Sequence, residues 1–124
     1  ECVLVRALSG DEVPGFTDSY FSPIGVLDFA DALDAALTAG SSGFLHLGSK
    51  NAISKYEFAR LVMESNNCDM SLLKPITVDE IGLSANRPRN TSLNVDLLKK
   101  LMGRSVPTVE QGILRAANES KPFN

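Results

Sequence analysis

The chain has 124 residues, of which 44% are hydrophobic and 22% are charged, and its formal net charge at pH 7 is −3. This length suits one small domain with a modest core, so we expect a single domain over residues 1–124. The acidic balance and the lack of a basic stripe argue against a nucleic-acid partner. No run approaches the ~20 apolar residues that span a bilayer, so no membrane partner is expected.

The first third of the chain indicates two extended segments and a helix. Val13–Asp18 and Ser22–Ile24 each contain a proline, which confines a strand to an edge position or a bulge. A helix is expected over Asp28–Ala39, with Asp28 as the N-cap that accepts from first-turn amides. The residues expected to face the core recur at helical spacing: Ala30, Leu33 and Leu37.

The apolar run Phe44–Leu47 is bounded by glycines and is predicted to be a strand, which gives a β-α-β order. It contains His46, the single histidine, which we expect to be a core or sheet-surface residue with a hydrogen-bond partner. One histidine and two cysteines fall short of the clustered ligands of a zinc site, so no metal is expected. Cys2 and Cys68 are expected to be reduced thiols in a cytoplasmic protein.

The clearest helix start lies at Ser54 and Glu57, which have the spacing of a capping box. The apolar face that follows predicts a helix to about Glu64. Lys55 and Tyr56, just after the cap, are interpreted as ordinary surface and rim positions rather than ligand contacts.

The remainder of the chain indicates an extended segment at Leu72–Thr77 and a short turn or helix around Asp79–Leu83. Asn94 is placed to cap a helix that ends before Gly103, and Thr108 with Gln111 forms a second capping box at the last helix. About four helices and a few short strands make this an α/β fold.

Between these elements lies Arg87-Pro88-Arg89-Asn90. Proline disfavours the helical region for the residue before it, so Arg87 is expected in extended backbone. A guanidinium fork matches the oxygens of a phosphate or carboxylate, which indicates an anionic ligand such as a diphosphate. The alternative is a surface loop whose arginines pair with nearby carboxylates, and spacing alone favours that alternative.

The order of several short motifs resembles the C-terminal part of dTDP-4-dehydrorhamnose reductases, in the extended short-chain dehydrogenase/reductase group. The motifs are Phe21-Ser22-Pro23-Ile24, Val26 to Leu33, Gly43 to Gly48, Ile53 to Ala59, and Arg87 to Asn90 with Leu93. The resemblance implies a small C-terminal substrate-binding domain without a complete Rossmann sheet. A close relative is the regulatory subunit of methionine adenosyltransferase, so a stand-alone regulatory or protein-interaction module is the alternative function.

The features that carry catalysis in that family are absent from this sequence. No Gly-x-Gly-x-x-Gly occurs, and Tyr20 and Tyr56 are followed four residues later by Ile24 and Arg60 instead of the family's lysine. We therefore assign no catalytic or cofactor-binding residue, although the parent family uses NADP or NAD. The chain is interpreted as a fragment or truncated relative, inactive on its own, and whether it is an enzyme stays open.

The resemblance also implies a set of substrate-binding residues. The Arg87 side chain would face the diphosphate of a nucleotide sugar, with Arg89 and Asn90 as weaker candidates. The segment containing Asp18, Tyr20 and Ser22 would border the pocket. Many relatives have Asp-Gln where this chain has Asp18-Ser19, so one amide contact to the ligand is lost. An apolar face left by the missing domain would favour self-association.

Overall fold

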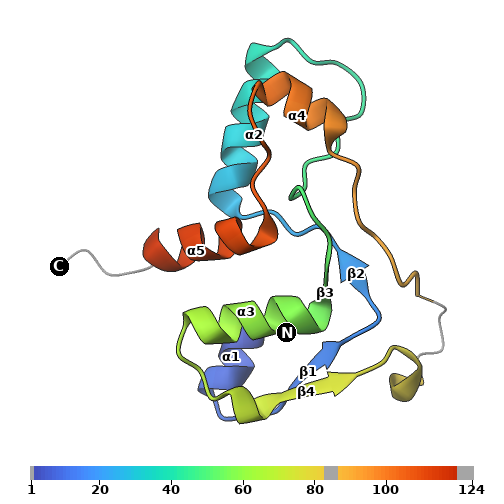
Figure 1. Cartoon of the computed structure of the whole chain (residues 1–124), viewed down its shortest axis with the longest axis vertical. Coiled ribbons are helices and arrows are strands. Elements are labelled where there is room, and N and C mark those ends of the chain that lie inside the picture. Colours follow the sequence, from blue (N-terminus) through green and yellow to red (C-terminus); the bar gives the residue numbers. More distant parts are fainter. Residues whose placement is uncertain (1, 83–86, 120–124) are drawn as a thin grey trace. The chain divides into compact units, whose positions relative to one another are not determined.

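The computed structural model describes residues 2–82 and 87–119 and has the α/β fold class predicted from the sequence. Within these residues it contains five α-helices and two separate two-stranded sheets, and no complete Rossmann sheet (Figure 1). The chain forms two compact units. The first combines Glu1–Phe21 with Ile53–Thr91, and the second combines Ser22–Ala52 with Ser92–Asn124. None of the described helices is long and apolar enough to cross a bilayer.

The first unit contains both sheets. Strand β1 (Val13–Phe16) runs parallel to β4 (Leu73–Ile76), and β2 (Tyr20–Phe21) runs antiparallel to β3 (Ile53–Ser54). The other elements of this unit are α1 (Val3–Leu8), α3 (Lys55–Ser65) and the short 3-10 helices η1 (Met70–Leu72) and η2 (Asp79–Ile81). The α1 helix was not expected from the sequence.

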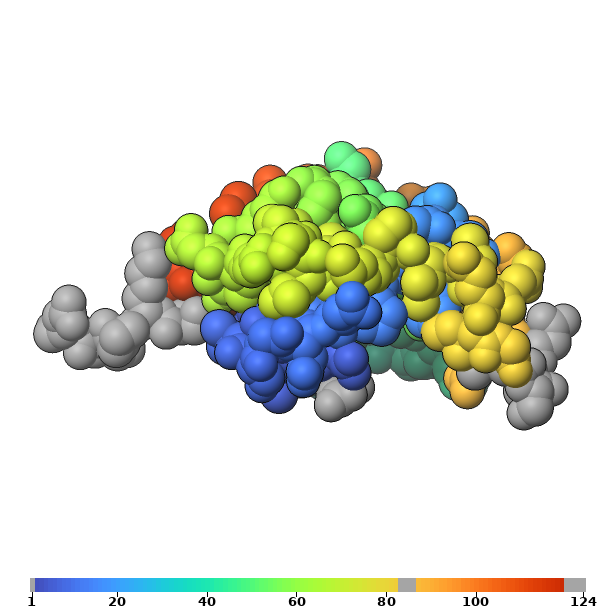
Figure 2. Space-filling view, turned by 90° about the horizontal axis from the view of Figure 1, so that it is seen from below, coloured from blue at the N-terminus to red at the C-terminus, as the bar shows by residue number. Residues whose placement is uncertain are grey.

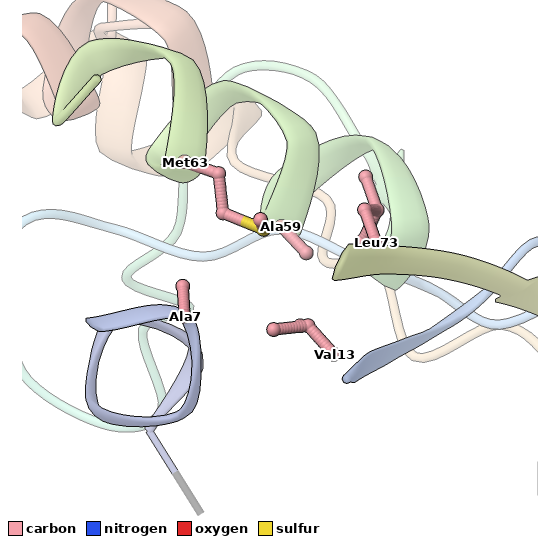
Figure 3. Packing of buried hydrophobic residues seen from close by; sticks show 5 residues of the cluster. All are labelled: Ala7, Val13, Ala59, Met63 and Leu73. Carbon is pink, nitrogen blue, oxygen red and sulfur yellow. The ribbon is translucent and has the colours of Figure 1, made fainter. Parts of the chain in front are cut away.

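The core of the first unit gathers one small cluster from four elements. Figure 3 shows Ala7 of α1, Val13 of β1, Ala59 and Met63 of α3, and Leu73 of β4 directed toward one another. Met63 is completely buried in this cluster. In the space-filling view the residues of α1 and β1 lie against those that follow α3 (blue and yellow-green in Figure 2). These contacts position β1 and α3, each of which contributes one residue to the candidate site.

Glycine at position 15 allows β1 to approach α3 closely. A Cβ added to Gly15 would lie 2.8 Å from the Cα of Tyr56, which is too close for two carbon atoms. The start of α3 is fixed locally, because the Ser54 hydroxyl accepts a hydrogen bond from the Glu57 amide at 3.1 Å. The predicted cap is confirmed, and it makes Lys55 the first residue of the helix.

The second unit is built from α2 (Val26–Thr38), α4 (Asp96–Met102) and α5 (Val109–Glu119). Its buried cluster consists of Ala32, Val95, Leu98 and Val106. Two predicted helix ends are confirmed. Gly103 follows α4 with a left-handed φ of 62°, and Thr108 and Gln111 exchange hydrogen bonds between side chain and backbone amide at the start of α5.

The predicted details of α2 are wrong in two respects. The N-cap is Gly25, and Asp28 lies in the first turn, where it is buried and pairs with Arg115 of α5 at 2.6 Å. Asp28 and Ala32 are the buried residues of α2, so the face of the helix that packs inward differs from the predicted face. Leu33 and Leu37 are consequently 42% and 71% exposed.

The predicted strand at Phe44–Leu47 is also wrong, as is the resulting β-α-β order. Leu45 and Leu47 pack against the cluster of the second unit, whereas the side chains of Phe44 and His46 are exposed. The alternation typical of a strand is present, but no described strand pairs with this run. A strand without a neighbour leaves its backbone groups to water. His46 is accordingly neither a core nor a sheet residue.

Candidate anion-binding site

The segment 87–91 is attached to β2 through its backbone. The Tyr20 amide donates to the Arg89 carbonyl at 2.7 Å, and the Thr91 amide donates to the Tyr20 carbonyl at 2.9 Å. Tyr20 therefore forms a parallel bridge with Asn90 on one side and pairs with Ser54 of β3 on the other. The predicted loop is held against β2 by this isolated bridge, and all of these residues belong to the first unit.

The Arg89 guanidinium is occupied by two carboxylates. Its Nη1 lies 2.5 Å from Asp18 Oδ2, and its Nη2 lies 2.7 and 2.8 Å from the two oxygens of Asp79. The hydrogen bonds with Asp79 raise the pKa of Arg89 above its ordinary value. The other oxygen of Asp18 accepts from the Val78 amide at 3.0 Å. This network ties segment 87–91 to the residues that precede β2 and to η2.

A cavity of about 290 Å³ lies beside this network in the first unit. The described residues that line it are Phe16, Ser19, Lys55, Val78, Arg87, Pro88 and Thr91. They include two cations, two hydroxyl groups and an apolar wall, and no carboxylate. A cavity with this lining favours an anion that also has hydroxyl or apolar groups.

The two cations differ from the other basic residues nearby. Within the described residues, neither Lys55 nor Arg87 has an ion pair with a carboxylate, whereas Arg60 pairs with Glu57 and Glu64. The Lys55 ammonium lies 5.7 Å from the centre of the Phe16 ring, in the range of a cation–π contact. Both charges are therefore available to a ligand. Among the described residues, no group of three His, Cys, Asp or Glu side chains could hold a metal ion.

The family model of the RmlD substrate binding domain matches residues 1–121. The chain belongs to this family. It is 30% identical over 105 residues to the probable low-salt glycan biosynthesis reductase Agl14 of Haloferax volcanii, covering 85% of this chain and 35% of that protein. The family resemblance inferred from the motifs, to the substrate-binding part of dTDP-4-dehydrorhamnose reductases, is thereby confirmed.

Solved structures share the fold of this RmlD-type chain. The dTDP-4-dehydrorhamnose reductase of Bacillus anthracis str. Ames, solved in complex with NADP, matches with a TM-score of 0.82 and 22% identity, covering 95% of this chain and 42% of that one. The reductase of Clostridium acetobutylicum ATCC 824 also has a TM-score of 0.82, at 18% identity, covering 97% and 42% of the two chains. This chain thus spans less than half the length of these proteins.

The structure brings part of the expected RmlD-type site together. Arg87 lines the cavity, while Asp18 and Arg89 pair with each other beside it. Tyr20 contributes backbone hydrogen bonds, and its side chain is 44% exposed. Asn90 forms the bridge to Tyr20 described above.

Ser22 belongs to the second unit, where its hydroxyl accepts from the Leu93 amide at 3.3 Å. Besides Pro88, which follows Arg87, five lining residues were not predicted from the sequence, namely Phe16, Ser19, Lys55, Val78 and Thr91. Only Lys55 carried a usable signal, since it follows a predicted N-cap and was thus placed at a helix start. Nothing in the local sequence indicated that Phe16 or Thr91 would lie beside it.

Proposed function

We propose that the cavity of the first unit binds the phosphate groups of a nucleotide sugar, as the dTDP-sugar-binding portion of a dTDP-4-dehydrorhamnose reductase-like protein. The observation that carries this proposal is the difference between two neighbouring arginines. The guanidinium of Arg89 is paired with Asp18 and Asp79, while Arg87 lines a cavity whose described lining holds no carboxylate. The family membership and the names of the similar proteins support a sugar-nucleotide ligand.

The described side chains fit distinct parts of such a ligand. The planar Arg87 fork can donate paired hydrogen bonds to phosphate oxygens. The hydroxyls of Ser19 and Thr91 can exchange hydrogen bonds with sugar or phosphate oxygens, and Phe16 with Val78 offers apolar surface to a ring. Pro88 restricts the backbone of Arg87, so less conformational freedom is lost on binding.

In the parent reaction that we propose, NADPH or NADH would supply a hydride to the C4 ketone of dTDP-4-dehydrorhamnose. These 124 residues contain neither the Gly-x-Gly-x-x-Gly turn nor the Tyr-x-x-x-Lys pair of that family. We therefore expect the chain to bind ligand without turnover, since ligand binding without the hydride and proton donors does not lower the chemical barrier. Ketone-dependent NADPH oxidation by the purified chain would contradict this expectation.

Binding is tested by titrating the ¹⁵N-labelled chain with dTDP and dTDP-rhamnose and following the backbone amide shifts. We expect shifts at Ser19, Lys55 and residues 87–91, and their loss in Arg87→Ala. Lys50→Ala serves as a charge-matched control, because Lys50 is exposed and belongs to the second unit. A folded chain whose spectrum does not respond to either ligand would refute the proposal.

A protein-interaction role is the second candidate, and exposed apolar residues of the second unit favour it. Val26 and Leu37 of α2 are 84% and 71% exposed, and Phe44 is fully exposed. Large apolar side chains exposed to water promote self-association. Sedimentation velocity should detect a concentration-dependent dimer that Leu37→Ser with Phe44→Ser weakens. A monomer over the whole concentration range would exclude self-association.

A further inference from the structure

We propose that Lys55 is a second phosphate-binding residue of this cavity and that the pair Lys55 and Arg87 selects a diphosphate over a monophosphate. This inference rests on the proposed function and adds to it a residue and a preference between ligands. The local sequence favoured an ordinary surface position for Lys55. The tertiary structure instead places it in the lining of the same cavity as Arg87.

The backbone of Lys55 is fixed relative to the Arg87 segment. Lys55 is the first residue of α3, and its amide donates to the Ser19 carbonyl at 2.9 Å. The preceding Ser54 pairs with Tyr20, which bridges to Asn90 on its other side. Lys55 and Arg87 are therefore carried by backbone on opposite sides of the same short strand. Such a pair is preorganised, so a ligand that contacts both loses little free energy in assembling the site.

The surroundings of Lys55 favour an anion from outside the protein. The Phe16 ring lies 5.7 Å from the ammonium, and Val78 and Pro88 complete an apolar wall that limits water around bound charge. The described lining holds no carboxylate that would neutralise Lys55. Lys74, elsewhere in the same unit, has Glu12 within 3.9 Å of its ammonium. The partial positive charge at the start of α3 adds to the same field.

Two cations on different elements favour two anionic groups. Arg87 can bind one phosphate through its planar fork, and the Lys55 ammonium can act as a point charge for the next phosphate. A monophosphate offers a single group and cannot occupy both positions in this way. We therefore expect the loss of Lys55 to reduce the affinity for dTDP more than the affinity for dTMP.

Calorimetric titration of the full chain with dTDP, dTMP and inorganic pyrophosphate tests the inference. In Lys55→Gln we expect an affinity for dTDP about tenfold lower, the scale of one lost charge-assisted contact, with a smaller change for dTMP. Lys55→Arg should retain most of the dTDP affinity, and Lys50→Gln should leave it unchanged. Weak pyrophosphate binding beside tight dTDP binding would assign the ligand class to nucleoside diphosphates rather than to the free anion.

The outcomes separate this inference from the proposed function. If the wild-type chain binds none of the three ligands, both are refuted. If Arg87→Ala abolishes dTDP binding while Lys55→Gln leaves it intact, the nucleotide site stands and the role of Lys55 is refuted. If Lys55→Gln weakens dTMP and dTDP equally, the preference for a diphosphate is refuted. Backbone amide spectra of the ligand-free variants that match the wild-type spectrum away from the substituted residue would establish that each variant remains folded.

Discussion

Arg89 and Asp18 form an ion pair at 2.5 Å across a separation of 71 residues. Asp79 binds the other terminal nitrogen of Arg89, and Asp18 also accepts the amide of Val78. The network therefore joins the residues that precede β2, the start of η2 and segment 87–91. The two arginines of the Arg-Pro-Arg-Asn motif have separate environments, since Arg89 holds the segment while Arg87 lines the cavity.

Removing this ion pair should weaken ligand binding without removing a ligand contact. In Arg89→Ala we expect a several-fold loss of dTDP affinity, because the Arg87 segment loses its attachment to Asp18. Asp18→Asn should give a similar loss, and the double variant should lose little more than either single variant, since both changes break the same link. A double-mutant cycle by calorimetry measures this coupling. Fully additive losses would indicate that the two residues act separately.

Two adjacent leucines of α4 provide a matched test of the second core. Leu98 is completely buried, whereas Leu97 is 52% exposed. Leu98→Ala should lower the free energy of unfolding by about 2–5 kcal/mol, the usual cost of a cavity at a buried leucine. Leu97→Ala should cost less than about 1 kcal/mol. Urea unfolding followed by circular dichroism compares them, and equal costs would contradict the packing of α4.

Asp31 should contribute to acid sensitivity. The hydrogen bond from Arg115, at 2.8 Å, lowers the pKa of the Asp31 carboxyl below its ordinary value. The unfolded chain then binds a proton more readily than the folded chain. The stabilisation from Asp31 is thus fully present above the unfolded pKa, near pH 4, and is lost as the pH falls through the lower folded value.

The corresponding measurement is the thermal midpoint of unfolding between about pH 6 and pH 2.5. Asp31→Asn should show a shallower decline in acid than the wild-type chain. Added salt should narrow the difference, because the carboxyl is 41% exposed and its charge is screened. Asp34→Asn, an exposed position on the same helix, is the control. A decline in Asp31→Asn as steep as in the wild-type chain would exclude the ion pair as its cause.

Features that depend on a few neighbouring residues were predictable. The caps at Ser54 and Thr108 and the left-handed Gly103 are formed within three or four residues, so short sequence patterns contain all of their partners. The family could also be inferred, because the order of motifs along the chain is a property of the sequence. The α1 helix escaped prediction because it has no side-chain cap, and its burial comes from α3 and β1.

Features that depend on distant partners were decided by tertiary structure. Asp28 suited an N-cap locally, but its partner Arg115 is 87 residues away. Phe44–Leu47 has the alternation of a strand, yet strand formation requires a neighbour that hydrogen-bonds to it. Likewise, residue type and Pro88 marked Arg87 as a candidate, while the pairing of β2 with both β3 and Asn90 brought Lys55 to the same cavity. Hydrogen bonds within three or four residues can be predicted from a short stretch of sequence. The place of a charged side chain such as Lys55 in a cavity depends instead on pairing between distant segments.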